Sequence, residues 1–293
     1  MKYQCFFFLL LGGLFSLCAP AFAQADSLLM ARYQRCVEDY FDAYERGQVD
    51  SAELALRSAL SILPTYGGNF LLEANLAELV VARCDTVEAL GLLTSALNRQ
   101  PHLDTIRSRR AELLTQSRRL EDALADLDEL LKQYPKSEIY RYRRALLLRD
   151  LGLPEGAVAD LQKIVEHNPK AYIPQVTLAE VLFDQGENLR AEQILTRLID
   201  EYPQQHMAAR VLTKCYLKSD QKAQALATIR KAINSGTRVT AEEYLVRGMV
   251  WLAYGEQKEA EKDFGKAKEL GANDRSVHDA NAWVHDMRQG NRP

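Results

Sequence analysis

Small apolar residues and prolines recur along the chain with a fixed period. The prolines stand 34 residues apart, at Pro101, Pro135, Pro169 and Pro203. An alanine precedes each proline by twelve residues, at Ala89, Ala123, Ala157 and Ala191. A leucine precedes each proline by eight residues, at Leu93, Leu127, Leu161 and Leu195. A repeat of this length is typical of stacked structural units, so the hydrophobic pattern indicates a solenoid.

The alanine ladder extends in both directions and defines seven units. Ala52 lies 37 residues before Ala89, and Ala225 and Ala260 continue the ladder toward the C-terminus. A second position, twelve residues before each ladder alanine, is mostly small and is occupied by Tyr40, Ala77, Ala111, Ala145, Ala179, Thr213 and Gly248. Small residues at both positions allow two helices to pack closely. Between the two positions several units carry a glycine, at Gly47, Gly152, Gly186 and Gly255. Each unit is therefore predicted to be a helix, a tight turn and a second helix.

The unit length, the paired small residues and the closing proline resemble the tetratricopeptide repeat, which has 34 residues. The resemblance covers residues 33–274 and implies an all-α fold, a right-handed superhelical solenoid of about seven helix-turn-helix units. The expected units are 33–69, 70–103, 104–137, 138–171, 172–205, 206–240 and 241–274.

A C-terminal capping helix is expected at residues 275–288. Val277, Ala280, Val284 and Met287 recur at steps of three and four and therefore share one helical face, and Trp283 lies beside them. The terminal units of solenoids need such a cover for their exposed apolar face. Residues 24–293 are thus predicted to form a single solenoid domain.

The first 23 residues have the features of a signal peptide. Met1 and Lys2 precede an apolar run from Cys5 to Leu17, and the small-residue pattern Ala21-Phe22-Ala23 follows it. We expect cleavage after Ala23 and a periplasmic or secreted mature protein that has no stable transmembrane segment. An uncleaved membrane anchor is the alternative, because the run extended to Ala23 approaches the ~20 residues of a bilayer span.

Composition and motifs exclude several classes of function. The chain has 37 basic and 40 acidic side chains and a formal net charge of −3, so we expect no nucleic-acid partner. It contains no H-E-x-x-H, no C-x-x-C, no phosphate-binding glycine loop and no G-x-S-x-G motif. His278 and His285 share a helical face, but they are separated by ~10 Å at ~1.5 Å per residue, too far to bind one metal ion. We therefore expect no catalytic residues, no cofactor and no metal.

The strongest candidate for function is a set of charged and aromatic residues on the first helices of the units. The resemblance implies that these helices line a concave groove. The candidate groove residues are Arg109, Tyr142, Arg143, Arg149, Glu180, Phe183, Arg210 and Lys214. Guanidinium groups bind carboxylates in a bidentate manner, so the groove is predicted to bind an extended acidic peptide or partner protein.

Two neighbouring arginines are expected to have a structural role instead. Arg110 and Arg144 are predicted to pair with Asp126 and Asp160, because both residue types recur with the same 34-residue period. The chain as a whole is thus predicted to be a non-catalytic protein-interaction scaffold of the cell envelope. A self-associating structural component of an envelope complex is the alternative, and an enzyme or a small-ligand-binding protein is a more remote one.

Overall fold

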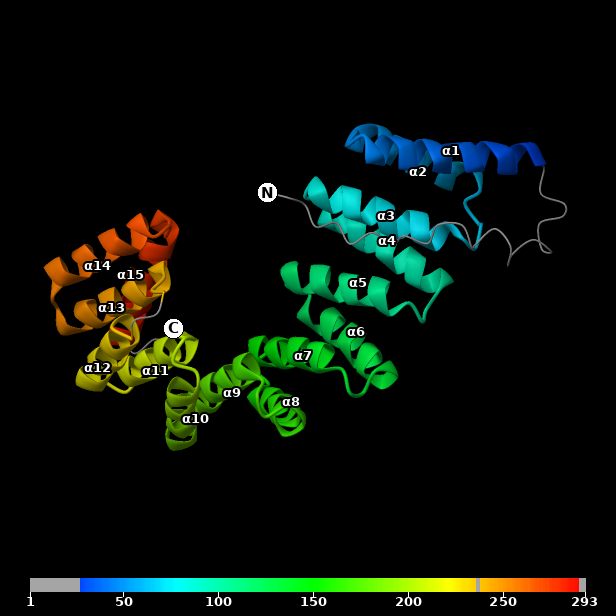
Figure 1. The fold of residues 1–293 in the computed structure, drawn as a ribbon. Coiled ribbons are helices and arrows are strands. Elements are labelled where there is room, and N and C mark those ends of the chain that lie inside the picture. Colours follow the sequence, from blue (N-terminus) through cyan, green and yellow to red (C-terminus); the bar gives the residue numbers. More distant parts are fainter. Residues whose placement is uncertain (1–26, 236–237, 290–293) are drawn as a thin grey trace. The chain divides into compact units, whose positions relative to one another are not determined.

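A computed structural model describes residues 27–235 and 238–289 of the 293-residue chain, and these residues form α-helices joined by short turns (Figure 1). The all-α fold predicted from the sequence is confirmed, and the described residues contain no strand. No helix within these two ranges is both long enough and apolar enough to cross a membrane. The expected signal peptide, residues 1–23, and its cleavage site lie outside the described residues.

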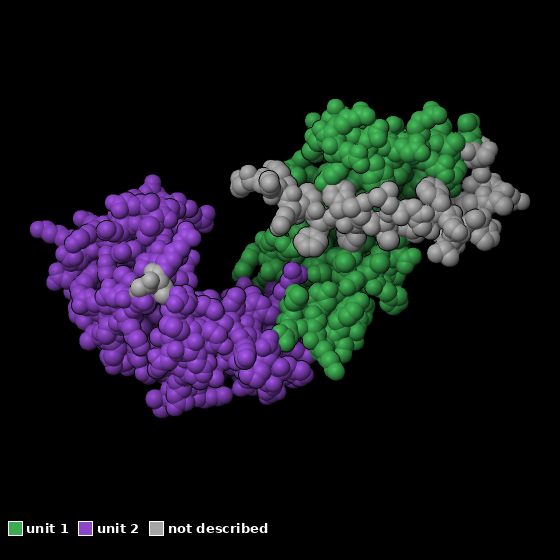
Figure 2. Space-filling view, viewed as in Figure 1, with its two compact units in different colours: residues 1–140 green, residues 141–293 purple. Residues whose placement is uncertain are grey.

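The chain divides into two compact units, residues 1–140 and residues 141–293 (Figure 2). Unit 1 contains three successive helix pairs, in which each helix packs against its partner and the second helix of a pair packs against the first helix of the next. The helices of unit 1 are α1 (Ser27–Glu45), α2 (Val49–Ile62), α3 (Asn69–Ala82), α4 (Thr86–Arg99), α5 (Asp104–Gln116) and α6 (Leu120–Gln133).

The boundary between the units falls within α7 (Glu138–Asp150), after Tyr140. Unit 2 continues the same alternation of first and second helices, and its last helix packs against α13. Its further helices are α8 (Pro154–His167), α9 (Tyr172–Asp184), α10 (Asn188–Glu201), α11 (Met207–Lys218), α12 (Lys222–Ile233), α13 (Ala241–Tyr254), α14 (Gln257–Glu269) and α15 (Asp274–Arg288).

The alanine ladder lies on the second helices and is fully buried. Each of its members is 0% exposed: Ala52, Ala89, Ala123, Ala157, Ala191, Ala225 and Ala260. The other small position lies on the first helices and is buried as well. Thr213 occupies it in α11, where its hydroxyl donates to the backbone oxygen of Ala209 at 2.7 Å, so no polar atom is left unsatisfied. The two small positions therefore face the partner helices, as the sequence pattern predicted.

Gly248 shows how close this approach is. A Cβ atom added to this residue of α13 would lie 2.5 Å from Cε1 of Phe264 on α14, well inside van der Waals contact. Phe264 is itself buried at 6% exposure and belongs to the core of this end of unit 2. The aromatic ring of α14 thus occupies the volume of the missing side chain on α13.

One residue in each turn between paired helices has a positive φ angle. In the described part of the chain these residues are Gly47, Cys84, Arg118, Gly152, Gly186, Asp220 and Gly255. The glycines were recognisable in the sequence as helix breakers, but the other three residues carry side chains in a conformation that L-amino acids avoid. The turn therefore keeps its geometry even where the residue disfavours it, because the packing of the two helices determines where the chain reverses.

We predict different effects for two glycine-to-alanine changes in neighbouring helices. Gly265 of α14 has open space around its Cα, so Gly265→Ala should stabilise the fold by about 1 kcal/mol through helix propensity. Gly248→Ala gains the same propensity but overpacks Phe264, which costs ~1–3 kcal/mol. Thermal or urea unfolding of the two variants should therefore differ by at least about 1 kcal/mol. Equal stabilisation by both changes would contradict the close contact.

We predict that Arg118→Gly stabilises the protein by roughly 0.5–1 kcal/mol, because relief of the left-handed strain of ~1–2 kcal/mol exceeds the extra chain entropy of glycine in the unfolded state. Gly152→Ala, at the equivalent position of the next turn, is the matched control and should destabilise by a similar amount. Urea unfolding measures both. A loss of stability on Arg118→Gly would show that the arginine side chain contributes more than the backbone strain costs.

Candidate functional site

A repeated arginine–aspartate contact joins the two helices of several pairs. The contacts are Arg110 with Asp126, Arg144 with Asp160, and Arg247 with Asp263, each bidentate with N···O distances of 2.6–2.8 Å. The three aspartates are only 2–3% exposed. A buried carboxylate must be paired, and the fork of a guanidinium satisfies both of its oxygens. The structural role predicted for Arg110 and Arg144 is confirmed.

Arg109 of α5, one of the candidate groove residues, is also engaged within unit 1. Its Nε and Nη2 donate to the two carboxylate oxygens of Glu78 on α3 at 2.7 and 2.9 Å, and its Nη1 lies 3.0 Å from Glu112. Burial acts to lower the pKa of Arg109, but the hydrogen bonds and charge of the two glutamates outweigh it and raise the pKa. Any ligand carboxylate would therefore compete with two acids of the protein.

Arg210 of α11 is held in a similar way. It contacts Glu242 at 2.6 Å and donates to Glu243, a fully buried residue at the start of α13. Glu243 also accepts hydrogen bonds from the amide and hydroxyl of Thr240, which caps the helix. Burial acts to raise the pKa of Glu243, but the hydrogen bonds from Thr240 and Arg210 prevail and lower it. Arg210 thus ties α11 to α13.

Four of the other candidate residues line one cavity of about 220 Å³ in unit 2. Arg149 comes from α7, Glu180 and Phe183 from α9, and Lys214 from α11, so the first helices of three pairs contribute to the lining. The remaining lining residues are Asp184, Val211, Cys215, Lys218 and Trp283. We call this space the unit 2 cavity.

Tyr142 and Arg143 of α7 do not line the unit 2 cavity. The hydroxyl of Tyr142 lies 3.0 Å from Oγ1 of Thr177 on α9, and its ring packs against the core of unit 2. Arg143 is exposed on α7. The structure therefore brings together four of the eight candidate residues around one cavity, while the other four lie outside it.

The charged groups of the unit 2 cavity are largely paired with one another. Arg149 Nη1 lies 3.5 Å from Glu180, and Lys218 Nζ lies 3.1 Å from Asp184. Lys214 is half-buried and makes no hydrogen bond or ion pair with any described residue. With three cations and two carboxylates, the cavity has an excess of one positive charge.

The lining of the unit 2 cavity includes one thiol, Cys215. Burial raises the pKa of Cys215 to about 12, so this residue is a neutral thiol at physiological pH and acts as part of the apolar wall. Within the two described ranges, no group of three or more histidine, cysteine, aspartate or glutamate side chains could hold a metal ion. The arrangement is suited to binding an anionic, partly apolar group.

Trp283 is the aromatic lining residue that the sequence pattern did not assign to the groove. It lies on α15, the helix predicted as a cap, and it packs against the C-terminal core of unit 2 as well as lining the cavity. In the sequence, Trp283 stands out because it lies outside the apolar stripe of Val277, Ala280 and Val284.

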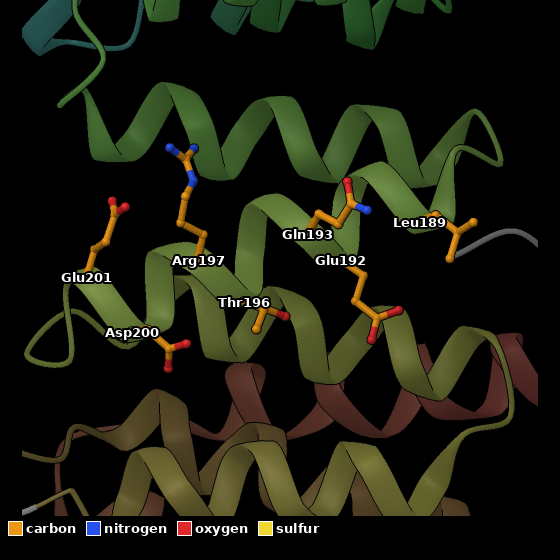
Figure 3. A pocket seen from close by; sticks show the side chains of 7 residues that line it. All are labelled: Leu189, Glu192, Gln193, Thr196, Arg197, Asp200 and Glu201. Atoms are coloured by element: carbon orange, nitrogen blue, oxygen red, sulfur yellow. The ribbon is translucent and has the colours of Figure 1, made fainter.

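A second depression, of about 790 Å³, lies on α10 and is lined by residues of that helix alone. Figure 3 shows Arg197 and Gln193 on one side of α10, while Glu192, Thr196 and Asp200 point to the other. Arg197 and Asp200 are engaged by Gln175 and Lys231. The side chains do not converge on a common space, so this depression is an open helix surface and a weaker candidate.

Comparison with known proteins identifies tetratricopeptide repeats in the middle of the chain. Two family models, both described as tetratricopeptide repeat, match residues 108–172 and residues 148–214. A search of curated proteins finds no significant match. Tetratricopeptide repeats are therefore present over residues 108–214, as the sequence pattern predicted.

Solved structures show the same fold over most of the chain. A tetratricopeptide repeat protein from Parabacteroides merdae ATCC 43184 matches with a TM-score of 0.69 and 29% identity, over 87% of this chain and 99% of that one. PilW, a widely conserved type IV pilus biogenesis factor, matches with a TM-score of 0.53 and 18% identity, over 72% and 97%. A thermophilic tetratricopeptide repeat protein from Thermus thermophilus matches with a TM-score of 0.50 and 19% identity, over 64% and 99%. The protein has the fold of a tetratricopeptide repeat solenoid.

We predict that Arg109 and Glu78 stabilise each other. In a double-mutant cycle with Arg109→Met and Glu78→Met, the coupling free energy from urea unfolding should be roughly 1 kcal/mol, because the bidentate pair is partly shielded from water. Each single change should lower the free energy of unfolding by more than half of the loss that the double change causes. A coupling near zero would mean that the contact with Glu78 does not contribute to stability.

Proposed function

We propose that this protein is a non-catalytic scaffold that binds an extended, acidic segment of a partner protein in the cell envelope. Tetratricopeptide repeat proteins generally act as protein-interaction scaffolds, and the repeats are present here. A solenoid presents side chains from successive first helices along one face, which suits a chain segment better than a compact substrate. The unit 2 cavity is lined by side chains of successive first helices, and we propose it as the binding surface.

The convergence of side chains in the unit 2 cavity is the observation that supports this function best. Arg149, Phe183 and Lys214 come from three successive first helices and line the same space. They combine positive charge with an aromatic surface, the two features that recur where proteins bind anionic peptides. Arg109 and Arg210 are secondary contacts in the proposal, since each is already bound by two carboxylates.

The location of the proposed function outside the cytoplasm rests on the N-terminal sequence. The apolar run from Cys5 to Leu17 and the Ala21-Phe22-Ala23 pattern have the features of an exported protein. The partner would then be another protein of the cell envelope, bound by the mature chain that begins at Gln24.

Site-specific photo-crosslinking tests the proposed surface. A photoreactive phenylalanine analogue at position 183 keeps the aromatic character of the cavity, and cells carrying it should yield a discrete crosslinked partner on illumination. The same analogue at position 193, on the exposed face of α10, is the matched control and should yield at least roughly tenfold less of that product. Addition of 1 M salt should weaken the crosslink from position 183, because the Debye length falls to ~3 Å.

Two results would contradict the proposal. Crosslinking that is equally strong from both positions would mean that the partner is not confined to the unit 2 cavity, and crosslinking from position 193 alone would place it on α10. A crosslink from position 183 that is unaffected by salt would exclude an acidic segment as the ligand.

A further inference from the structure

The cationic side chains that line the unit 2 cavity differ in whether they already contact a carboxylate. Arg149 and Lys218 each lie next to a carboxylate of the cavity, so their charges are balanced within the protein. Lys214 lines the same cavity but has no acidic or hydrogen-bonding partner among the described residues. Its ammonium group is the one charge of the cavity that an incoming anion could neutralise without displacing an acid of the protein.

Partial burial makes this lysine receptive to an anion. A half-buried ammonium group loses part of its hydration, and Lys214 makes no ion pair with the described part of the protein in return. A ligand carboxylate would supply that charge through an N–H···O hydrogen bond, and such charge-assisted bonds are stronger than neutral ones. Carboxylates at Arg149 or Lys218 would instead meet Glu180 or Asp184, which repel a second negative charge.

The apolar part of the cavity comes from two aromatic residues on different elements. Phe183 belongs to α9, and Trp283 belongs to α15, the last helix of unit 2. Both are half-buried, so each presents part of its ring to the cavity while the rest packs against the core. Aromatic faces of this kind bind an aliphatic or aromatic side chain at low conformational cost.

The geometry points to a two-part recognition motif in the partner: an aspartate or glutamate next to a large apolar residue, in an extended segment of another protein. The carboxylate binds Lys214, and the apolar side chain lies between Phe183 and Trp283. The assignment rests on the proposed function and sharpens it, because it makes the capping helix α15 part of the binding site. An extended segment with scattered acidic residues but no apolar neighbour would bind weakly.

A tryptophan fluorescence titration tests this motif. Trp283 and Trp251 are the two tryptophans of the chain, so a Trp251→Phe background leaves Trp283 as the single reporter in the cavity. The probes are blocked peptides that contain Asp-Phe or Asp-Leu in a glycine–serine context, each with an Asn counterpart. We expect the Asp peptides to change the Trp283 emission and to bind roughly tenfold more tightly than the Asn peptides.

Two lysine variants distinguish a specific contact at Lys214 from a general effect of the protein's positive charge. Lys214→Gln should lower the affinity for the Asp peptides to that of the Asn peptides and leave the Asn peptides unaffected. Lys231→Gln removes the same charge from α12, where Lys231 pairs with Asp200 outside the cavity, and should leave both affinities unchanged. Circular dichroism should show the same helix content for both variants.

The outcomes distinguish this inference from the proposed function. Equal affinity for Asp and Asn peptides, no binding of either, or an equal effect of the two lysine changes would overturn the motif. If position 183 still crosslinks a partner in cells, the scaffold function stands and only the motif is wrong. If that crosslink is also absent, the cavity is not the binding surface and both proposals fail.

Discussion

The close approach of paired helices at small residues is the constraint on which the rest of this structure depends. Every alanine of the ladder is completely buried, and at Gly248 even a methyl group would collide with Phe264. Interiors packed at this density tolerate little change in volume. The separation of the two helices in a pair is therefore set by the residue type at these positions, and the first helices present their outward side chains at regular intervals.

The close packing of the helices also requires that buried charges are paired. Helices that approach so closely bury the aspartates of the second helices, and each buried carboxylate needs a cation from its partner helix. The similar segments Arg107-Ser108-Arg109-Arg110 and Arg141-Tyr142-Arg143-Arg144 supply these cations in two successive pairs. Much of the arginine-rich character of these first helices is thus used inside the protein, and the cation of the unit 2 cavity that remains available is Lys214.

The turns show how tertiary contacts prevail over local preference. Cys84, Arg118 and Asp220 adopt the left-handed conformation at the positions where other pairs have glycine. Their positive φ angles cost energy that the contacts of the adjoining helices offset. The location of each turn was visible from the repeat spacing, but the conformation of these three residues was not, because cysteine and arginine disfavour it and aspartate only tolerates it.

Periodicity alone was sufficient to predict the helical fold, the buried alanine ladder and the pairing of Arg110 with Asp126, because all of these lie within one repeat and recur at fixed spacing. The same reasoning grouped Arg109 with Lys214, since both lie on first helices. Only the tertiary structure distinguished them. Arg109 meets Glu78 on a neighbouring first helix, whereas Lys214 meets no acid among the described residues and shares its cavity with Trp283, from the far end of the chain. Which charges remain free depends on the helices that pack beside them, and the spacing within a single repeat carries no information about these contacts.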